Sequence, residues 1–406
     1  MKITCSRQEL VEALSNVSRA AAQKSPLKPL EGILFKAYGT EIYLCCYNLE
    51  IGIAKSLSAT VSKSGDVIMP LRLCEYARRM NGETITIECN EKYAIHITSG
   101  YASYDIIGMP AIDFPELPTV DTEQSINLPE NILRSMISQT SYAVSNRADM
   151  PPQYSGVLFE LSQTAIRLVA LDGYRVAVRE EQISCGVECS FIIPSKTVGE
   201  MFKLLSDKED TCELCIAKHN MICRINGYSL ISRLMTGTFM NYQNTIDAIK
   251  GHTATVKTSD MIAAVERVSL IATEADRSPI CCMFCDSRIN FICETGTSRA
   301  VDNMSCTSDT SGETEIGFNH RYLLDALRAA DDENVVIVFS DGRNPILMKP
   351  VEGERFRFLL MPVLLKAASP ENSVASRAGD PQYRDSDEMD APEEDEADFS
   401  YNEEDE

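Results

Sequence analysis

The sequence has 406 residues, of which 44% are hydrophobic, and a formal net charge of −22. No apolar run approaches the roughly 20 residues that cross a bilayer, and the opening "MKITCSRQEL" lacks the apolar core of a secretory signal, so we expect a cytoplasmic protein. The charge is uneven: residues 367–406 contain 15 Asp and Glu against two Arg, a net of −13, which leaves −9 for residues 1–366. The acidic total therefore does not exclude a nucleic-acid partner, and the tail has the composition of a disordered segment.

The fifteen cysteines do not by themselves indicate disulfides, because a long chain without an export signal favours reduced thiols. Two CxxC spacings, Cys212/Cys215 and Cys282/Cys285, fall in stretches typical of strands, where positions i and i+3 point to opposite faces. That arrangement is poorly suited to a shared zinc ion. We therefore expect buried thiols, and neither a metal nor another cofactor.

The predicted elements recur with a period of about 125 residues, the size of a domain. Each unit opens with an amphipathic helix, at 6–20, 129–143 and 259–272, and the first begins with a capping pair, Ser6 and Glu9. The units share an apolar strand start, a turn, a strand-to-helix junction and a late strand. The four anchors are Phe35, Phe159 and Phe284; Asn48, Asp172 and Thr297; Pro70, Pro194 and Asn319; and Met109, Met235 and Met361.

This order of helix, strands, helix and strands predicts an α+β domain with antiparallel sheets, present three times. We place the domains at 1–122, 123–248 and 249–366, followed by the acidic tail at 367–406. Breaks are indicated by "DFPELPTVDTEQ" at 113–124 and by the stretch 245–252.

The stretch "LVALDGYRVAV" at 168–178 predicts a hairpin that Asp172-Gly173 closes as a tight two-residue turn. Arg175 lies just past this turn, inside an otherwise apolar strand. One interpretation is an exposed edge arginine that extends its charge into solvent. The other is a binding site at the end of the hairpin.

Basic residues recur at matching places in the three units. The second helix of each unit carries a pair spaced i, i+7, which shares one helix face, and the first helices add single arginines. These residues are Arg72/Arg79, Lys196/Lys203 and Arg321/Arg328, with Arg19, Arg134 and Arg267. A lone pair is usually a solvated face, but threefold repetition favours a surface that meets a repeating anion, such as a phosphate backbone bound without base readout.

Four stretches together resemble the bacterial β sliding clamp, the DNA polymerase III beta subunit: "MPAIDFPELP", "VALDGYRVAV", "EIGFNHRYLLDAL" and "LLMPVLL". The resemblance covers residues 1–366. It implies three clamp domains per chain and a head-to-tail homodimer that closes a ring around double-stranded DNA, with helices lining the hole. It also implies a processivity factor that tethers the replicative polymerase, the clamp loader and other proteins through a peptide groove.

The resemblance implies roles for further residues. The partner-peptide groove would contain Tyr154, Leu171, Gly173, Tyr174, Arg175, Val176, Met240, Asn244, Leu359, Met361, Pro362, Val363 and Leu364. Lys24 and Arg147 would add to the DNA-facing residues. Ring closure would use Tyr104 and Ile106 against Leu270 and Ile271 of the other chain. Chemically, the groove would be an apolar slot with one fixed cation, suited to a peptide with a glutamine and apolar anchors.

Some features depart from the family pattern. Met240 and Asn244 lie where an Arg-Phe-Pro-Asp-Tyr type segment is usual, and Leu364 replaces an arginine. The tail is either inert, or competes with partner peptides through Phe399 and Tyr401, or repels DNA from the wrong face by its charge. These departures leave open an alternative, a divergent clamp paralogue from a phage or mobile element with other partners. An enzyme is disfavoured, because the four histidines have no triad or metal spacing and no Walker or GxGxxG loop occurs.

Overall fold

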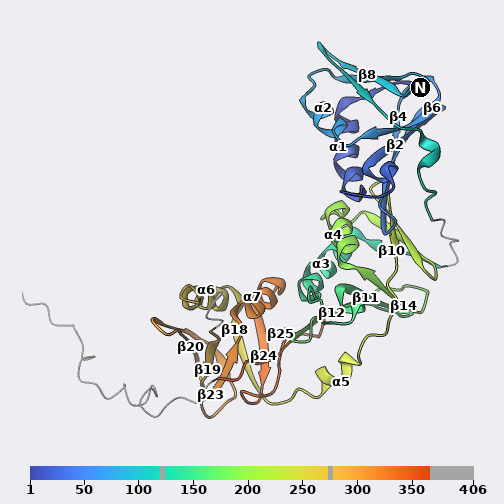
Figure 1. Ribbon diagram of the computed structural model, residues 1–406. Coiled ribbons are helices and arrows are strands. Elements are labelled where there is room, and N and C mark those ends of the chain that lie inside the picture. Colours follow the sequence, from blue (N-terminus) through green and yellow to red (C-terminus); the bar gives the residue numbers. More distant parts are fainter. Residues whose placement is uncertain (119–123, 273–277, 366–406) are drawn as a thin grey trace, which may run out of the picture. The chain divides into compact units, whose positions relative to one another are not determined.

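The computed structural model describes residues 1–118, 124–272 and 278–365 (Figure 1). Phe399, Tyr401 and the rest of the acidic tail lie outside the described residues. Within them the chain forms three α+β domains, each with two helices and two antiparallel groups of strands. None of the helices in the described ranges is long and apolar enough to span a membrane.

The bounds of the elements follow the repeat seen in the sequence. The first domain contains β1 (Lys2–Ser6), α1 (Arg7–Val17), β2 (Gly32–Tyr38), β3 (Glu41–Tyr47), β4 (Ile51–Ser58), β5 (Thr60–Lys63), β6 (Gly65–Pro70), α2 (Leu73–Arg79), β7 (Thr84–Cys89), β8 (Ala94–Ser99) and β9 (Ala102–Ile107). The second contains β10 (Gln124–Pro129), α3 (Glu130–Thr140), β11 (Gly156–Leu161), β12 (Ile166–Leu171), β13 (Arg175–Glu181), β14 (Cys189–Pro194), α4 (Ser195–Leu204), β15 (Thr211–Ile216), β16 (Asn220–Ile225) and β17 (Tyr228–Arg233), and is followed by α5 (Tyr242–Asp247). The third contains β18 (His252–Lys257), α6 (Thr258–Ser269), β19 (Ile280–Phe284), β20 (Arg288–Glu294), β21 (Arg299–Ser305), β22 (Thr307–Ser308), β23 (Thr314–Phe318), α7 (His320–Ala329), β24 (Asn334–Phe339), β25 (Ile346–Pro350) and β26 (Phe356–Leu360).

Neighbouring domains share sheets. An eight-stranded sheet joins the first and second domains where β4 pairs with β17, and a nine-stranded sheet joins the second and third where β13 pairs with β26. An edge strand leaves a row of backbone N–H and C=O groups unpaired, and pairing across a domain boundary satisfies them. We call these contacts the first junction (β4 with β17) and the second junction (β13 with β26).

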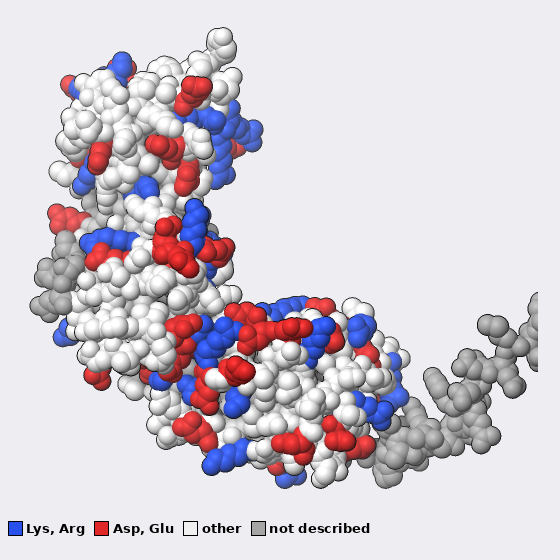
Figure 2. Space-filling model, turned by 180° about the vertical axis from the view of Figure 1, so that it is seen from behind, with Lys and Arg blue, Asp and Glu red and all other residues white. Residues whose placement is uncertain are grey.

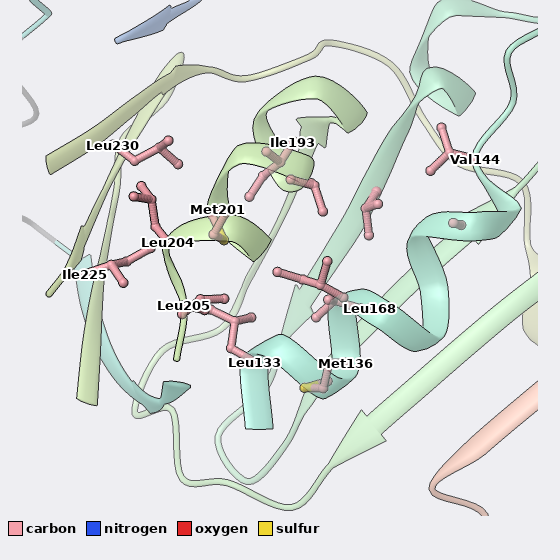
Figure 3. Packing of buried hydrophobic residues seen from close by; sticks show 14 of the residues in the cluster. Leu133, Met136, Val144, Leu168, Ile193, Met201, Leu204, Leu205, Ile225 and Leu230 are labelled. Carbon is pink, nitrogen blue, oxygen red and sulfur yellow. The ribbon is translucent and has the colours of Figure 1, made fainter. Parts of the chain in front are cut away.

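The helices form by burying one face on these sheets. In α1, the buried residues Leu10, Ala13, Leu14 and Val17 follow the i, i+3, i+4, i+7 spacing of a helix face. Buried residues in α3 and α6 keep the same spacing: Leu133, Met136, Ile137 and Thr140, and Met261, Ala264, Val265 and Val268. Figure 3 shows α3 and α4 of the second domain contributing Leu133, Met136, Met201 and Leu204 to this core.

The predicted turn at 172–173 is wrong by one residue. The tip of the hairpin is Gly173–Tyr174, because the Asp172 N–H donates to the Arg175 carbonyl at 3.3 Å and closes the loop around these two residues. The Asp172 carboxylate accepts from the backbone N–H of Tyr174 at 2.9 Å and of Arg175 at 3.1 Å, and Gly173 has a φ of 88°. An aspartate that accepts from its own loop moves the turn one position onward.

The predicted late-strand anchor in the third domain is also wrong. After its last strand, each domain adds one bridge to an edge strand, and the bridges pair Met109 with Ile68, Met235 with Ile192, and Val363 with Gly317. Val363, not Met361, is therefore the counterpart of Met235. Met361 follows Met235 by the same 126 residues that separate Met235 from Met109. The bridge of the third domain, however, forms two residues later in the chain, at Val363.

Candidate functional site

Arg175 is neither an exposed edge arginine nor an open cation, because protein groups surround its guanidinium. The residue is 9% exposed. Its Nε donates to Asp172 Oδ2 at 2.9 Å, Nη1 to Asp325 Oδ2 at 2.6 Å, and Nη2 to the Tyr142 carbonyl at 2.7 Å. The Tyr322 ring lies 4.4 Å from the guanidinium carbon. Since Asp325 is on α7, Arg175 fixes the hairpin of the second domain to a helix of the third.

The electrostatics of this cluster follow from its burial. Burial by itself lowers the pKa of Arg175, but the hydrogen bond that its guanidinium donates to Asp325 and the charge of Asp172 outweigh it and raise that pKa above its ordinary value. Burial also raises the pKa of Tyr142 and of Tyr322. The arginine therefore remains charged and both tyrosines remain neutral, which makes the cluster an ion-paired structural element.

An apolar floor lies beside Arg175. Leu171, Val176 and Leu359 occupy three adjacent strands, with Val176 opposite both Leu171 and Leu359. All three are buried in one cluster, against which Tyr154 and Phe239 pack. The rings of Tyr154 and Phe239 meet edge to face at 5.1 Å. The hairpin and the last strand therefore form one continuous apolar surface.

The rim of this surface is exposed, although its side chains are large and apolar. Met361 donates its backbone N–H to the Tyr174 carbonyl at 2.8 Å, which ties the chain after β26 to the tip of the hairpin. The exposed fractions are Tyr174 45%, Met240 46%, Met361 39%, Val363 38% and Leu364 72%. Clustered exposed apolar side chains are typical of a surface that binds another molecule.

The remaining predicted groove residues lie around this rim. Gly173 is at the hairpin tip, next to Met150, and Pro362 is half-buried between Met361 and Val363. Asn244 is exposed on α5, where its backbone N–H donates to the cap residue Asn241. A pocket of about 620 Å³ adjoins Met240 and is lined by Leu158, Glu160, residues 190–192 and residues 235–243.

Sequence reasoning missed several residues of this site. Tyr322 stacks on Tyr174 at 6.0 Å as well as on Arg175, and Asp325 and Tyr142 hold the guanidinium. Tyr322 and Asp325 lie close after Arg321, which the repeated basic pairs predicted as a site residue. Nothing in the local sequence indicates that this helix contacts Arg175, 150 residues before Asp325.

The basic pairs on the second helices are all exposed. Arg72 and Lys196 have no ion pair within the described part of the chain, and Arg321 is exposed on α7. The second member of each pair has a carboxylate partner: Arg79 with Glu75 at 3.0 Å, Lys203 with Glu200 at 2.7 Å, and Arg328 with Glu266 at 2.6 Å. Figure 2 shows Lys and Arg side chains gathered along the right-hand edge of the first domain, the side that carries α2 in Figure 1.

The basic residues of the first helices contact protein instead. Arg19 pairs with Glu200 at 3.5 Å across the first junction. Arg134 stacks on Phe202, donates to the Leu205 carbonyl at 3.1 Å and pairs with Asp207 at 2.8 Å, which caps the end of α4. Arg267 pairs with Asp302 at 2.6 Å. Arg147 pairs with Asp149 and lies over the Tyr174 ring, whereas Lys24 is exposed.

Two of the predicted dimer residues lie on an edge strand, and the other two follow the end of a helix. Tyr104 and Ile106 are in β9, the last strand of its sheet, and Tyr104 stacks on Tyr76 of α2 at 4.5 Å. Leu270, at the end of α6, is 83% exposed, and Ile271 is half-buried. The helix α6 packs on β21, the end strand of the four-stranded sheet.

Comparison with known families decides the relationship. The N-terminal, central and C-terminal domain models of the DNA polymerase III beta subunit match residues 1–118, 127–241 and 249–364. The chain belongs to the DNA polymerase III beta subunit family. Beta sliding clamps from Staphylococcus aureus and Staphylococcus epidermidis are 26% and 25% identical to it over 376 residues, which cover 89% of this chain and 99% of each relative.

Solved structures of beta subunits share the fold. A putative DNA polymerase III beta subunit from Eubacterium rectale is 25% identical with a TM-score of 0.85, covering 89% of this chain and 99% of that one. A sliding clamp from Bartonella birtlesii bound to griselimycin is 26% identical with a TM-score of 0.84, covering 90% and 100%. The Bacillus subtilis sliding clamp, at 23% identity and a TM-score of 0.86, supports the fold alone.

Proposed function

We propose that this chain is a DNA sliding clamp, a cytoplasmic processivity factor that encircles double-stranded DNA and holds the replicative polymerase on it. The observation that carries the proposal is the match of all three beta-subunit domains in their family order. The chain acts without catalysis or a cofactor: its domains, at 1–122, 123–248 and 249–366, build a ring from two copies. An ATP-driven clamp loader would have to open that ring in trans.

Two copies close the ring head to tail. The first and second junctions pair β4 with β17 and β13 with β26. In the described part of the chain, β9 is an edge strand of the five-stranded sheet and β21 an edge strand of the four-stranded sheet. Pairing β21 of one copy with β9 of the other repeats the internal contact. Tyr104, Ile106, Leu270 and Ile271 lie at these ends and supply apolar surface for the closure.

DNA retention rests on enclosure together with weak cationic contacts. Arg72, the cap residue before α2, and Lys196 and Arg321 in the first turns of α4 and α7 are exposed at matching places, so the three helix starts present a positive charge to one repeating surface. Contacts of this kind bind phosphates without reading sequence, and a closed ring needs no strong individual contact. Further positive charge on the DNA-facing surface comes from Arg79, Lys203, Arg328, Lys24 and Arg147.

The apolar surface at the second junction binds linear peptides of the polymerase, the loader and other clamp users. Leu171, Val176, Leu359 and Tyr154 form its floor, and Tyr174, Met240, Met361 and Val363 its rim. Arg175 shapes this groove from within, since its charge is matched by Asp172 and Asp325. Peptides are therefore selected by apolar anchors and by backbone hydrogen bonds rather than by an acidic group.

The comparisons support the main interpretation and not the alternative of a divergent paralogue. The departures at Met240, Asn244 and Leu364 are all exposed at the rim, so they would alter which peptides bind while leaving the floor intact.

Primer extension tests the proposal. With a bacterial replicative polymerase and its loader on primed circular DNA, adding this chain is expected to lengthen the products made in a single binding event. Products of unchanged length would contradict it. Fluorescence anisotropy of a labelled clamp-binding pentapeptide tests the groove: Phe239→Ala, next to Tyr154, is expected to weaken binding, whereas Lys36→Ala, an exposed change on β2, is not.

A further inference from the structure

The first junction repeats the turn and the closing hydrogen bond of the second. The Asn48 side chain accepts from two backbone N–H groups of its own loop, at 3.0 and 2.8 Å, as Asp172 does in the hairpin of the second domain. After β17, the N–H of Arg233 donates to the Glu50 carbonyl at 2.9 Å, in the way that the chain after β26 is tied to the tip of that hairpin. The backbone frame of the groove is therefore present at both junctions.

The floor of the groove also has a counterpart at the first junction. A row of three residues crosses β3, β4 and β17, as the floor of the groove crosses β12, β13 and β26. The row at the first junction is Tyr47, Gly52 and Ile231, and the row at the second is Leu171, Val176 and Leu359. All of these residues are buried, and the middle of the row changes from a valine to a glycine. The first junction therefore has a floor of the same construction with an empty place at its centre.

The chain's own residues 113–118, "DFPELP", fill that place. Phe114 is 9% exposed and is buried in one apolar cluster with Tyr47, and Leu117 packs against the same cluster. A Cβ atom added to Gly52 would lie only 3.3 Å from Cδ2 of Leu117. Leu117 therefore lies over the middle of the floor, and it can do so because Gly52 has no side chain.

The corresponding segment of the second domain takes a different course. Phe239 follows Phe114 by 125 residues, so both segments carry a phenylalanine at the same place. Tyr242 follows Leu117 by the same 125 residues, but its hydroxyl donates to Glu160 of β11, a strand that does not border the second junction. The second segment thus turns away from the junction after its phenylalanine, whereas the first one lies on the floor.

We propose that the first junction is a second copy of the peptide groove, and that residues 113–118 are its resident ligand, held by Phe114 and Leu117. The proposal rests on the peptide groove proposed for the second junction. The bridge between Met109 and Ile68 fixes the chain just before the segment. A ligand on so short a tether has an effective concentration in the millimolar range, so it excludes partner peptides from this groove. Each chain then presents one groove to its partners instead of two.

The segment has the properties of a linear peptide ligand, and its groove differs from the other in the rim. Pro115 and Pro118 restrict the backbone, which lowers the entropy that the segment loses when it is held in place. The rim positions that are apolar at the second junction are charged at the first, where Glu50 and Arg233 are exposed. The two grooves should therefore accept peptides with apolar anchors but different flanking residues.

Fluorescence anisotropy with a labelled peptide of the chain's own residues 111–118, AIDFPELP, tests the proposal. The groove would be emptied in the full chain by Phe114→Ser with Leu117→Ser. The emptied chain is expected to bind the peptide about 10-fold more tightly than the unchanged chain, because the tethered competitor is gone. Ile112→Ser, in the same stretch but at a residue that is 90% exposed, is the matched control and is expected to bind as weakly as the unchanged chain.

A second variant leaves the segment itself unchanged. Gly52→Val places the valine of the second junction beneath Leu117, and the strand accepts it because Gly52 does not have a positive φ. This variant is expected to lower the melting temperature, and Leu117→Ala in the same chain is expected to restore part of the loss. Effects of the two changes that simply add in thermal unfolding would show that Leu117 does not lie over Gly52, and would overturn the proposal.

The peptide measurements also separate this inference from the proposed function. Equal binding of AIDFPELP to the emptied and unchanged chains would overturn the assignment, because the peptide would then use a surface other than the first groove. No binding to either chain, with cooperative thermal unfolding retained in the emptied one, would overturn it as well. Failure of the unchanged chain to bind a clamp-binding pentapeptide would instead contradict the groove proposed at the second junction.

Discussion

The first and second junctions have the same strand register but different side chains around it. At the first, Arg19 pairs with Glu200 at 3.5 Å and Asn16 donates to Tyr228. At the second, Arg175 is enclosed by two carboxylates, a carbonyl and the ring of Tyr322. The repeat thus sets the backbone frame, and the candidate site arises from side chains that only one junction carries.

The difference begins at a single position. Where the second junction has Arg175 opposite Leu360, the first has Ile51 opposite Ser232, and both of these are buried. The apolar side chain of Ile51 needs no hydrogen-bond or charge partner, so it is buried at the first junction by packing alone. An arginine at that position has to be matched, and Asp172 and Asp325 bring the hairpin and α7 together beside the apolar floor.

The largest expected effect is loss of the dimer, caused by disrupting the proposed interface between two copies of the chain. Leu270→Asp with Ile271→Asp places two charges where apolar surface would be buried, and is expected to yield monomers by light scattering, because an unpaired buried charge is costly. Leu27→Asp, at another exposed leucine, is the control. A dimer mass for the double variant would count against the interface.

The two internal junctions should differ in their tolerance of arginine loss. Arg175→Ala leaves the buried Asp172 carboxylate without its cation and is expected to cost about 2–4 kcal/mol in the free energy of unfolding. Arg19→Ala leaves Glu200 paired with Lys203 at 2.7 Å, and is expected to cost about 1 kcal/mol or less. Urea unfolding of both variants measures the difference, and equal costs would remove the distinction drawn between the junctions.

Neutralising the exposed cations should leave the junctions intact and change DNA binding. Changing Arg72, Lys196 and Arg321 to alanine is expected to flatten the slope of log affinity against log salt by about 0.9 for each DNA phosphate that the variant no longer neutralises. The control changes Lys36, Lys63 and Lys92, which are exposed on the strands of the first domain or the loops between them. An unchanged slope in the helix variant would make these cations ordinary surface charge.

The smallest expected effect concerns pH and the start of α7, the helix whose Asp325 pairs with Arg175. Burial, with the neighbouring charge of Arg321, lowers the pKa of His320 at the start of α7 below its usual 6.5. Because the folded state then binds the proton less well than the unfolded state, stability falls as pH drops below about 6.5. His320→Gln is expected to reduce that loss, as thermal unfolding between pH 5 and 8 would show. An identical pH dependence in the variant would assign the loss to other groups.

The sequence predicted the fold closely, because the repeat leaves periodic apolar signals in helices and strands. The three-domain α+β organisation is confirmed, and the exposed pairs on the second helices lie where their spacing indicated. The contacts of Arg19, Arg134 and Arg267 could not be predicted, since each depends on a residue from another element. Asp325 reaches Arg175 across 150 residues of sequence, and only tertiary packing brings them together.

Retention on circular and linear DNA tests the central claim most directly. The chain would be loaded onto a nicked circular plasmid by a bacterial clamp loader with ATP, separated by gel filtration in high salt, and then treated with an enzyme that cuts the plasmid once. We expect the chain to co-elute with the circle and to leave the DNA after the cut, because enclosure rather than affinity holds it. Co-elution that survives the cut, or no co-elution with the circle, would contradict the proposed sliding clamp.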